Sequence, residues 1–325
     1  MVISRAPFRV SFVGGGTDLP SFYERSYGMV ASTTVNKYMH IAVSEGFEPH
    51  MRLSYSRTEI VENVDEIKHP LIREALKLTE LTDRRLHIYS MGDVPAGTGL
   101  GSSSAFLVGL LKALWAHRGV YVSAARLAEQ ACHIEIDVLG EPIGKQDQYA
   151  AAFGGLRWIR FNADDTVEAE PIVCTRETLL SFQEHCMLFY LGSSRSASEV
   201  LAEQQANVDE NYEVMSQMRD LVPDFVRILQ RGTNLAELGE LLHQNWMLKR
   251  QLASGITNEG IDGYYADARS AGALGGKVLG AGGTGFFLVF CELHLQARVR
   301  EALGDLRYFP VAFEREGARI IYYEP

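Results

Sequence analysis

Val94-Pro95-Ala96-Gly97-Thr98-Gly99-Leu100-Gly101-Ser102-Ser103-Ser104-Ala105 is a glycine-punctuated loop that runs through three serines into an apolar segment of helical length. Glycine permits positive φ and a close approach of the backbone to a ligand. The free N–H groups and the positive dipole end of the following helix attract an anion, and the serine hydroxyls add donors or an oxygen ligand for magnesium. The stretch therefore predicts a phosphate-binding loop, with a plain loop capped by a serine as the alternative.

Two helices are predicted after this loop. The segment 103–117 is apolar nearly all round, so it should be buried on most sides and should fix the direction of the loop. The segment 123–136 has apolar residues at helical spacing and carries Glu135 near its end. A short polar turn is expected at 144–149, and it contains Asp147.

Short strands dominate the first half of the chain. The pattern changes near residue 175, and long helical stretches begin at about residue 196. The predicted strands are 8–13, 30–35, 38–43, 51–55, 86–89, 155–161, 187–191, 285–290, 308–313 and 319–323, and the further helices are 196–218, 220–230, 235–252, 259–271 and 294–303. This pattern predicts an α+β chain of two lobes, residues 1–175 and 176–325.

The amino-acid composition and the net charge exclude several classes of protein function. The 325 residues are 46% hydrophobic and 22% charged, as in a globular protein, and the net charge of −10 argues against a nucleic-acid-binding surface. The sequence has neither a signal-peptide pattern at its start nor 18 consecutive apolar residues, so we expect a cytoplasmic protein without membrane contact. Its four cysteines form no CxxC pair, which predicts neither a zinc nor a redox site.

Two further glycine-rich segments flank the central loop in the sequence. Gly14-Gly15-Gly16-Thr17-Asp18 follows a strand-like run, and its carboxylate could accept two sugar hydroxyls or bond its own turn backbone. Gly280-Ala281-Gly282-Gly283-Thr284-Gly285 spells GxGxxG, but a strand-like run follows it, whereas a dinucleotide-binding fingerprint opens a helix. We therefore interpret the later segment as a glycine corner between two strands.

Charged side chains supply candidates for phosphoryl transfer. Phosphoryl transfer to an alcohol is favoured by a carboxylate that orients the attacking hydroxyl and by a metal that screens the phosphate charge. Asp147 and Glu135 are the candidate carboxylates for these two tasks. Solvated surface acids are the alternative for both. Arg195 precedes a helix and could bind a substrate phosphate, with Lys277 and Lys37 as weaker candidates.

Taken in order, three segments resemble the GHMP kinases, a family that includes galactokinase, homoserine kinase, mevalonate kinase and phosphomevalonate kinase. They are Ala6-Pro7-x-Arg9 with its glycine loop, Pro95-x-Gly97-x-Gly99-Leu100-Gly101-Ser102-Ser103-Ser104-Ala105, and Lys277-x-x-Gly280-Ala281-Gly282-Gly283. The resemblance implies two lobes, an N-terminal mixed sheet with helices and a ferredoxin-like C-terminal α/β lobe.

The resemblance also implies roles for individual residues. Asp147 would be the catalytic carboxylate, and Arg9 would act on it or on the attacking hydroxyl. Ser103, with Ser104 as its neighbour candidate, and Glu135 would hold Mg²⁺. The ATP phosphates would lie on Pro95, Gly97, Gly99, Leu100, Gly101, Ser102, Ser103 and Ser104, and the substrate would contact Gly15, Gly16, Thr17, Asp18, Arg195, Lys277, Gly280, Gly282 and Gly283.

Within the family, Gly14-Gly15-Gly16-Thr17-Asp18-Leu19-Pro20, the segment around Asp147 and Trp246-x-x-Lys249 look most like the bacterial kinases of D-glycero-D-manno-heptose 7-phosphate. This implies an ATP- and Mg²⁺-dependent phosphorylation of the anomeric hydroxyl, for activated heptose used in capsule, S-layer or lipopolysaccharide. The alternatives are another sugar 1-kinase of the fucose, galactose or mannose type, and a sugar and ATP sensor without turnover. The expected partner is a small sugar phosphate, and the resemblance allows a homodimer.

Overall fold

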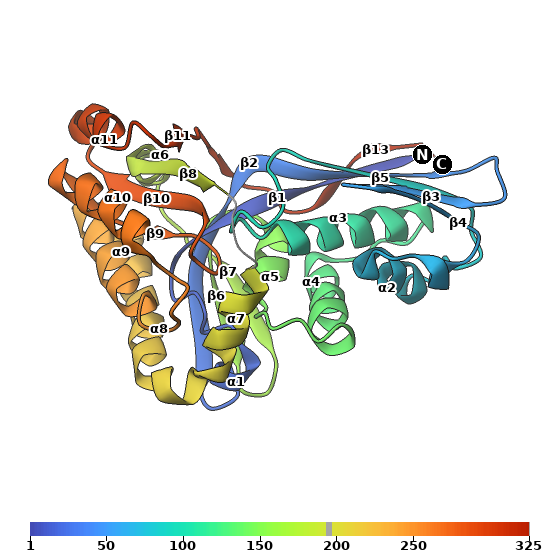
Figure 1. Cartoon of the computed structure of the whole chain (residues 1–325), viewed down its shortest axis with the longest axis horizontal. Coiled ribbons are helices and arrows are strands. Elements are labelled where there is room, and N and C mark those ends of the chain that lie inside the picture. The colour runs from blue at the N-terminus through green and yellow to red at the C-terminus, as the bar shows by residue number, and fades with distance from the viewer. Residues whose placement is uncertain (193–196, 325) are drawn as a thin grey trace.

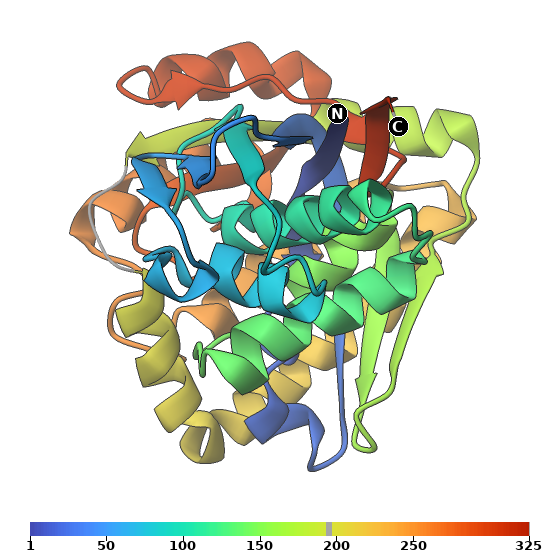
Figure 2. The ribbon, with the colours of Figure 1, turned by 90° about the vertical axis from the view of Figure 1, so that its right-hand side faces the viewer.

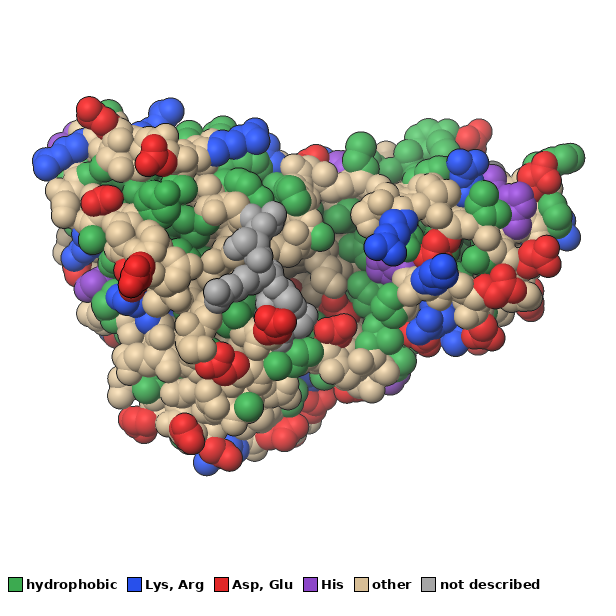
Figure 3. All heavy atoms as spheres, in the orientation of Figure 1, with side chains coloured by type: hydrophobic (Ala, Val, Ile, Leu, Met, Phe, Trp, Pro, Cys, Tyr) green, Lys and Arg blue, Asp and Glu red, His purple; other side chains and the backbone are tan. Residues whose placement is uncertain are grey.

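Two sheets organise residues 1–192 and 197–324, the part of the chain that this computed structural model describes, and helices pack against each sheet (Figure 1). Within this part of the chain no helix is both long and apolar enough to cross a membrane. On the face drawn in Figure 3, basic and acidic side chains are interspersed over the outer end of the first lobe.

The first sheet has nine strands among the described residues. They are β1 (Val2–Val13), β2 (Tyr27–Glu45), β3 (Met51–Ser54), β4 (Thr58–Val61), β5 (Leu86–Gly92), β6 (Arg157–Asn162), β7 (Val167–Pro171), β12 (Phe313–Glu314) and β13 (Arg319–Tyr323), with the main order β13-β1-β2-β5-β3-β4. Its pairs are antiparallel except β3 with β5. The long strand β2 pairs with β6 through its first part and with β5 through its last part. It therefore forms the axis of the sheet.

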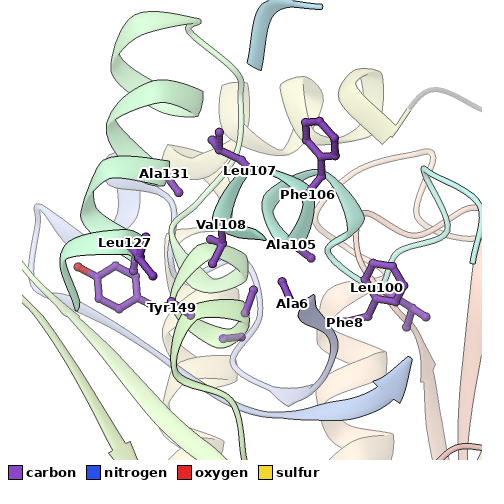
Figure 4. Close-up of a cluster of buried hydrophobic side chains, with 14 of the residues drawn as sticks. Ala6, Phe8, Leu100, Ala105, Phe106, Leu107, Val108, Leu127, Ala131 and Tyr149 are labelled. Carbon is purple, nitrogen blue, oxygen red and sulfur yellow. The ribbon is translucent and has the colours of Figure 1, made fainter. Parts of the chain in front are cut away.

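Helix α3 (Ser102–His117) is buried along most of its surface, as its apolar sequence predicts. Ala6 and Phe8 of β1 lie on one side of it, and Leu127 and Ala131 of α4 (Ala124–Cys132) lie on the other (Figure 4). Figure 2 shows α3 and α4 layered together with α2 (Pro70–Leu78). Because α3 is enclosed in this way, the position of its N-terminus is fixed.

The second sheet is antiparallel and has the order β11 (Arg307–Tyr308), β8 (Cys186–Gly192), β10 (Gly285–Cys291) and β9 (Ala273–Val278). Helices α8 (Val208–Arg231), α9 (Ala236–Lys249), α10 (Glu259–Ser270) and α11 (Gln296–Ala302) belong to this lobe (Figure 1). Helix α9 approaches β9 so closely that a Cβ at Gly275 would overlap the carbonyl group of Gly239. This close packing positions Lys249, the last residue of α9.

The remaining elements are short. They are α1 (Pro20–Tyr23), α5 (Gln146–Phe153), α6 (Arg176–His185), α7 (Ala197–Ala206), the 3₁₀ turns Val64–Glu66 and Leu293–Leu295, and the π-helical turn His133–Val138.

Several local predictions were wrong. The strands expected at 30–35 and 38–43 are one strand, β2, and the strand expected at 308–313 is two short strands, β11 and β12. The helix expected at 196–218 is interrupted between α7 and α8. The expected polar turn at 144–149 is the start of helix α5, where three alanines favour the helix after its polar first turn. The helix expected at 123–136 is α-helical only to Cys132, and wider π-helical turns follow. The break expected near residue 219 does not exist, because α8 continues through Pro223 and packs Val222 and Phe225 into the core.

The division of the chain into lobes at 175/176 stays a prediction. Strands β12 and β13 bear on it, because they come late in the sequence but belong to the first sheet. Both strands follow the second sheet in the sequence and pair with β2 and β1 of the first sheet. The backbone of Glu324 also bonds that of Met1, so the two ends of the chain lie together (Figure 2). Residues 313–323 are thus spatially part of the first lobe.

Candidate active site

A cavity of ≈ 350 Å³ opens where the end of β1, the N-terminus of α3, the start of α5 and the corner between β9 and β10 meet. Its lining combines three glycine segments with buried charged side chains. The lining includes Arg9, Ser11, Gly15, Gly16, Asp18, Gly97, Gly99, Gly101, Ser102, Ser103, Ser104, Glu135, Gln146, Asp147, Gln204, Lys249, Lys277 and Gly280.

The N-terminus of α3 forms one wall of this cavity. Its N-cap is Gly101, at φ +72°, and no side chain caps the helix. The first N–H groups of an α-helix have no partner within the helix, so they are available to an anion in the cavity. This geometry disagrees with the simple alternative of a loop capped by a serine.

The 95–105 loop rests on the glycine corner of the second sheet. Gly99 has φ +79°, and a Cβ there would lie 2.5 Å from the carbonyl oxygen of Leu279. The N–H of Phe286 donates to the carbonyl oxygen of Thr98 at 3.2 Å. The corner predicted at 280–285 does lie between two strands, β9 and β10, and it supports the loop by direct backbone contact.

Glu135 lies beside the serines. The hydroxyls of Ser103 and Ser104 each donate to its carboxylate at 2.8 Å, and Nε2 of Gln148 donates at 2.7 Å. Burial raises the pKa of Glu135 to about 7, although the three hydrogen bonds oppose this shift. Glu135 sits on the π-helical turn, and such turns occur often at functional sites.

These oxygen atoms fit a magnesium site. Mg²⁺ prefers hard oxygen ligands and is usually held by one or two carboxylates together with substrate phosphates and water. Glu135 and the exposed Ser103 offer a carboxylate and a hydroxyl at the cavity wall, while Ser104 is buried. Among the described residues no three His, Cys, Asp or Glu side chains cluster to form a complete metal cage.

Asp147 faces the cavity from the first turn of α5 and is paired with Arg9 of β1. Nε and Nη2 of Arg9 donate to the two carboxylate oxygens, each at 2.7 Å. The third guanidinium nitrogen of Arg9 donates to the carbonyl oxygen of Gly99. Arg9 is 4% exposed and Asp147 is 22% exposed, so the carboxylate, and not the guanidinium, is accessible from the cavity.

Asp18 links the first glycine loop to α5. Its carboxylate accepts hydrogen bonds from the backbone of Gly16 at 3.0 Å and from the backbone and side chain of Gln146 at 3.1 and 3.3 Å. Burial, followed by the nearby charge of Asp147, raises the pKa of Asp18. Asp18 therefore makes the backbone contacts of a turn aspartate and lines the cavity as well.

Two lysines complete the cavity. Lys249 is 4% exposed and Lys277 is 1% exposed. Burial, followed by the positive charge of Arg9, lowers the pKa of Lys249 to about 7. Burial, followed by the charge of Lys249, lowers the pKa of Lys277 well below its usual value.

Comparison with known proteins places the chain in a family. The descriptions "GHMP kinases N terminal domain" and "GHMP kinases C terminal" match residues 65–155 and 221–306. A mevalonate kinase of Archaeoglobus fulgidus is 30% identical over 68% of this chain and 72% of its own length. The chain belongs to the GHMP kinase family. It is therefore a phosphotransferase, and ATP is the expected phosphate donor of such a kinase.

Two further relatives match this GHMP kinase along nearly its whole length. A D-glycero-alpha-D-manno-heptose 7-phosphate kinase of Campylobacter jejuni is 25% identical over 97% of each chain. The crystal structure of a D-glycero-D-manno-heptose 1-phosphate kinase of Bacteroides thetaiotaomicron superposes with a TM-score of 0.83 at 24% identity and covers 100% of each chain. The predicted α+β fold of GHMP kinases is confirmed.

The structure of the GHMP kinase brings together most of the predicted site residues. Five of them do not line the cavity, namely Pro95, Leu100, Thr17, Gly282 and Gly283. Thr17 is buried and bonds the backbone of Gly14 and Met29, and Gly283 donates to the carbonyl oxygen of Ile256. These two positions support the loops from behind. Arg195 lies outside the described residues.

Several cavity residues had no predicted role, among them Ser11, Gln146, Gln204 and Lys249. Gln146 stands next to Asp147 and was hidden by the incorrect assignment of a turn. Lys249 was noticed only as part of a resembling segment, although a lysine four positions after the buried Asn245 on α9 lies on the same face of the helix.

Proposed function

We propose that this GHMP kinase transfers a phosphoryl group from ATP to the anomeric hydroxyl of D-glycero-D-manno-heptose 7-phosphate and releases the 1,7-bisphosphate. The observation that carries the proposal is the Asp147–Arg9 pair, which shares one cavity with the N-terminus of α3 and with Glu135. The heptose assignment is supported by the full-length similarity to the Campylobacter jejuni enzyme.

Asp147 is the proposed base or orienting group for the sugar hydroxyl. The bidentate bonds to Arg9 hold its carboxylate in one orientation and leave it accessible from the cavity. A carboxylate fixed in this way accepts the hydroxyl proton as the bond to phosphorus forms. Arg9 is the positioning residue, because its own hydrogen-bonding groups are turned toward Asp147 and Gly99.

The ATP phosphates are proposed to lie against the 97–104 backbone. The free N–H groups at the start of α3 and the positive end of its dipole bind the negative oxygens there. Ser103 and Glu135 would hold Mg²⁺, which when bound neutralises part of the phosphate charge. Ser103 is the better hydroxyl ligand because Ser104 is buried beside Glu135.

The sugar is proposed to lie against Gly15, Gly16 and Asp18, which line the same cavity as the serines. Its hydroxyls would compete with Gln146 for the carboxylate of Asp18, which already accepts three hydrogen bonds. The absence of a side chain at Gly15 leaves room for the ring, whereas the side chain of Gln204 fills the space beside Gly16.

Steady-state kinetics on matched sugars tests the proposal. The kcat/KM of heptose 7-phosphate should exceed that of the unphosphorylated heptose by at least about 100-fold, the scale of a well-placed charged contact. Equal values for the two sugars would point to a kinase of an unphosphorylated sugar, such as fucose, galactose or mannose. Binding of sugar and ATP without product would favour the sensor.

A further inference from the structure

Two buried ammonium groups share the cavity, and neither has a carboxylate partner among the described residues. Lys249 comes from the end of α9 and Lys277 from β9, and both are more than nine-tenths buried. Within residues 1–192 and 197–324, neither forms an ion pair within 4.0 Å, whereas Arg9 in the same cavity is paired with Asp147. Buried charges without a partner are costly, so this arrangement calls for an anion.

The hydrogen bonds of the two lysines leave donors free. Lys249 donates to the carbonyl oxygens of Val278 and Gly280, and Lys277 makes one long contact of 3.4 Å with the hydroxyl of Ser11. An ammonium group has three donors, so the protonated pair keeps three for a ligand. A phosphate monoester has three terminal oxygens, and it therefore matches this set.

Lys277 lies beside the first glycine loop, and Lys249 lies at the glycine corner that follows β9. A Cβ at Gly15 would be only 3.8 Å from Nζ of Lys277 and 3.8 Å from the hydroxyl of Ser11. The serines and Glu135, by contrast, belong to the wall formed by α3 and the π-helical turn. An anion on the lysine pair would thus be next to the loop proposed for the sugar.

The electrostatics of the cavity also favour an anion. Burial lowers the pKa of both lysines, and the charge of Arg9 at Lys249 and the charges of Lys249 and Arg9 at Lys277 add to this effect. The carboxylates of Asp18, and of Asp147 at Lys249, only partly offset it. A dianion placed between the two ammonium groups would stabilise their charged forms.

We propose that Lys249 and Lys277 together form the binding site for the phosphate group that the acceptor sugar carries. This assignment rests on the proposed function, since it names the residues that recognise the phosphorylated end of the substrate. The γ-phosphate of ATP has the same chemistry and is the competing source of the anion.

The test compares Lys249→Met and Lys277→Met with Lys112→Met. Methionine keeps the apolar stem and removes the charge, and Lys112 is a partly buried lysine of α3 that bonds Val122 outside the cavity. For each variant we would measure kcat/KM for heptose 7-phosphate and for unphosphorylated heptose, KM for ATP, and the thermal stabilisation produced by inorganic phosphate.

We expect Lys249→Met and Lys277→Met to lower kcat/KM for the phosphorylated sugar about 100-fold and to change that for the unphosphorylated sugar less than about threefold. KM for ATP should stay unchanged, and inorganic phosphate should stabilise the wild type and Lys112→Met more than it stabilises either cavity variant. Equal losses for both sugars, or a raised KM for ATP, would overturn the proposal.

Phosphate stabilisation separates this proposal from the function on which it rests. Suppose that the wild type phosphorylates no sugar phosphate, but that inorganic phosphate stabilises it more than it stabilises Lys277→Met. The heptose assignment then fails and the anion site stands. If phosphate stabilises the wild type and both methionine variants equally, the lysine site is wrong whichever sugar is the substrate. Lys277→Met should fold, because methionine removes a buried charge and only one long contact with Ser11. It keeps the test decisive even if Lys249→Met, which leaves two carbonyl oxygens without a donor, is destabilised.

Discussion

Arg9 joins the carboxylate of Asp147 to the backbone of Gly99. Two of its nitrogens bind the two oxygens of Asp147 at 2.7 Å, and the third binds the carbonyl oxygen of Gly99 in the loop proposed for ATP. One rigid guanidinium plane thus sets the position of the proposed catalytic group relative to the proposed donor site. This is the geometry that positioning requires in phosphoryl transfer.

Asp147→Asn should lower kcat by about 10³-fold or more, because the amide cannot accept the proton and weakens the pairing with Arg9. ATP binding, measured by calorimetry, should be largely retained. Asp220→Asn is the control, since Asp220 makes a similar contact with Arg219 at 2.8 Å on the exposed side of α8. Unchanged turnover in Asp147→Asn would remove this residue from the mechanism.

Ser103→Ala and Ser104→Ala should have different effects, although both hydroxyls bond Glu135. The exposed Ser103 is the proposed metal ligand, so its loss should raise the Mg²⁺ concentration for half-maximal activity about 10-fold or more. Loss of the buried Ser104 should instead lower the free energy of unfolding by about 1–3 kcal/mol, since a buried acceptor loses its donor. A magnesium titration and a urea titration of both variants distinguish these effects, and reversed results would exchange the two roles.

Gly99→Ala and Gly97→Ala compare two glycines of the same loop. Both have positive φ, +79° and +74°, but a Cβ at Gly97 meets no atom within 4 Å. Gly97→Ala should cost about 1 kcal/mol of unfolding free energy from backbone strain, whereas Gly99→Ala adds the overlap with Leu279 and should cost about 3 kcal/mol or more. Equal losses in a denaturant titration would mean that the two loops do not touch as described.

Lys249 makes stability depend on pH. Its pKa is lowered to about 7 in the folded protein, so between pH 7 and about 10.5 the unfolded chain binds more protons. The free energy of unfolding should therefore rise with pH in this window, and the contribution of Lys249 should be lost as the pH falls through 7. The maximum slope from one such group is about 1.4 kcal/mol per pH unit.

The matched measurement for Lys249 is the free energy of unfolding of the wild type and of Lys249→Met at pH 7 and pH 9.5. The difference in unfolding free energy between the two proteins separates the titration of Lys249 from the contributions of the other charged groups that face the cavity, which are Arg9, Asp18, Asp147 and Lys277. A pH-independent difference would show that the lysine keeps its ordinary pKa.

The glycine loops and the burial of helix α3 could be predicted from the sequence, because the residues that indicate them are neighbours along the chain. Glycines punctuate a turn, and an apolar surface all round a helix indicates burial, wherever the rest of the chain lies. The sequence also supplied Asp147 and Glu135 as candidates. The resemblance to GHMP kinases then implied their grouping, which spacing along the chain alone does not determine.

The contacts that connect these parts depend on distant segments, and the sequence did not reveal them. The bond of Arg9 to Asp147 spans 138 positions, and the approach of Lys277 to Ser11 spans 266. The helix α5 was missed because its first turn is polar and its length is only eight residues. Such short elements are stabilised mainly by packing, which a local pattern does not contain.

The pairing of β13 with β1 constrains the order in which this protein can acquire its structure. During synthesis β1 emerges first, yet its neighbour on one side is made only after the whole second sheet. On the ribosome, the first sheet therefore remains with an open edge while the other lobe is translated, and such an edge is prone to wrong pairing. Completion of the first lobe is among the last steps of folding, even though its sequence comes first.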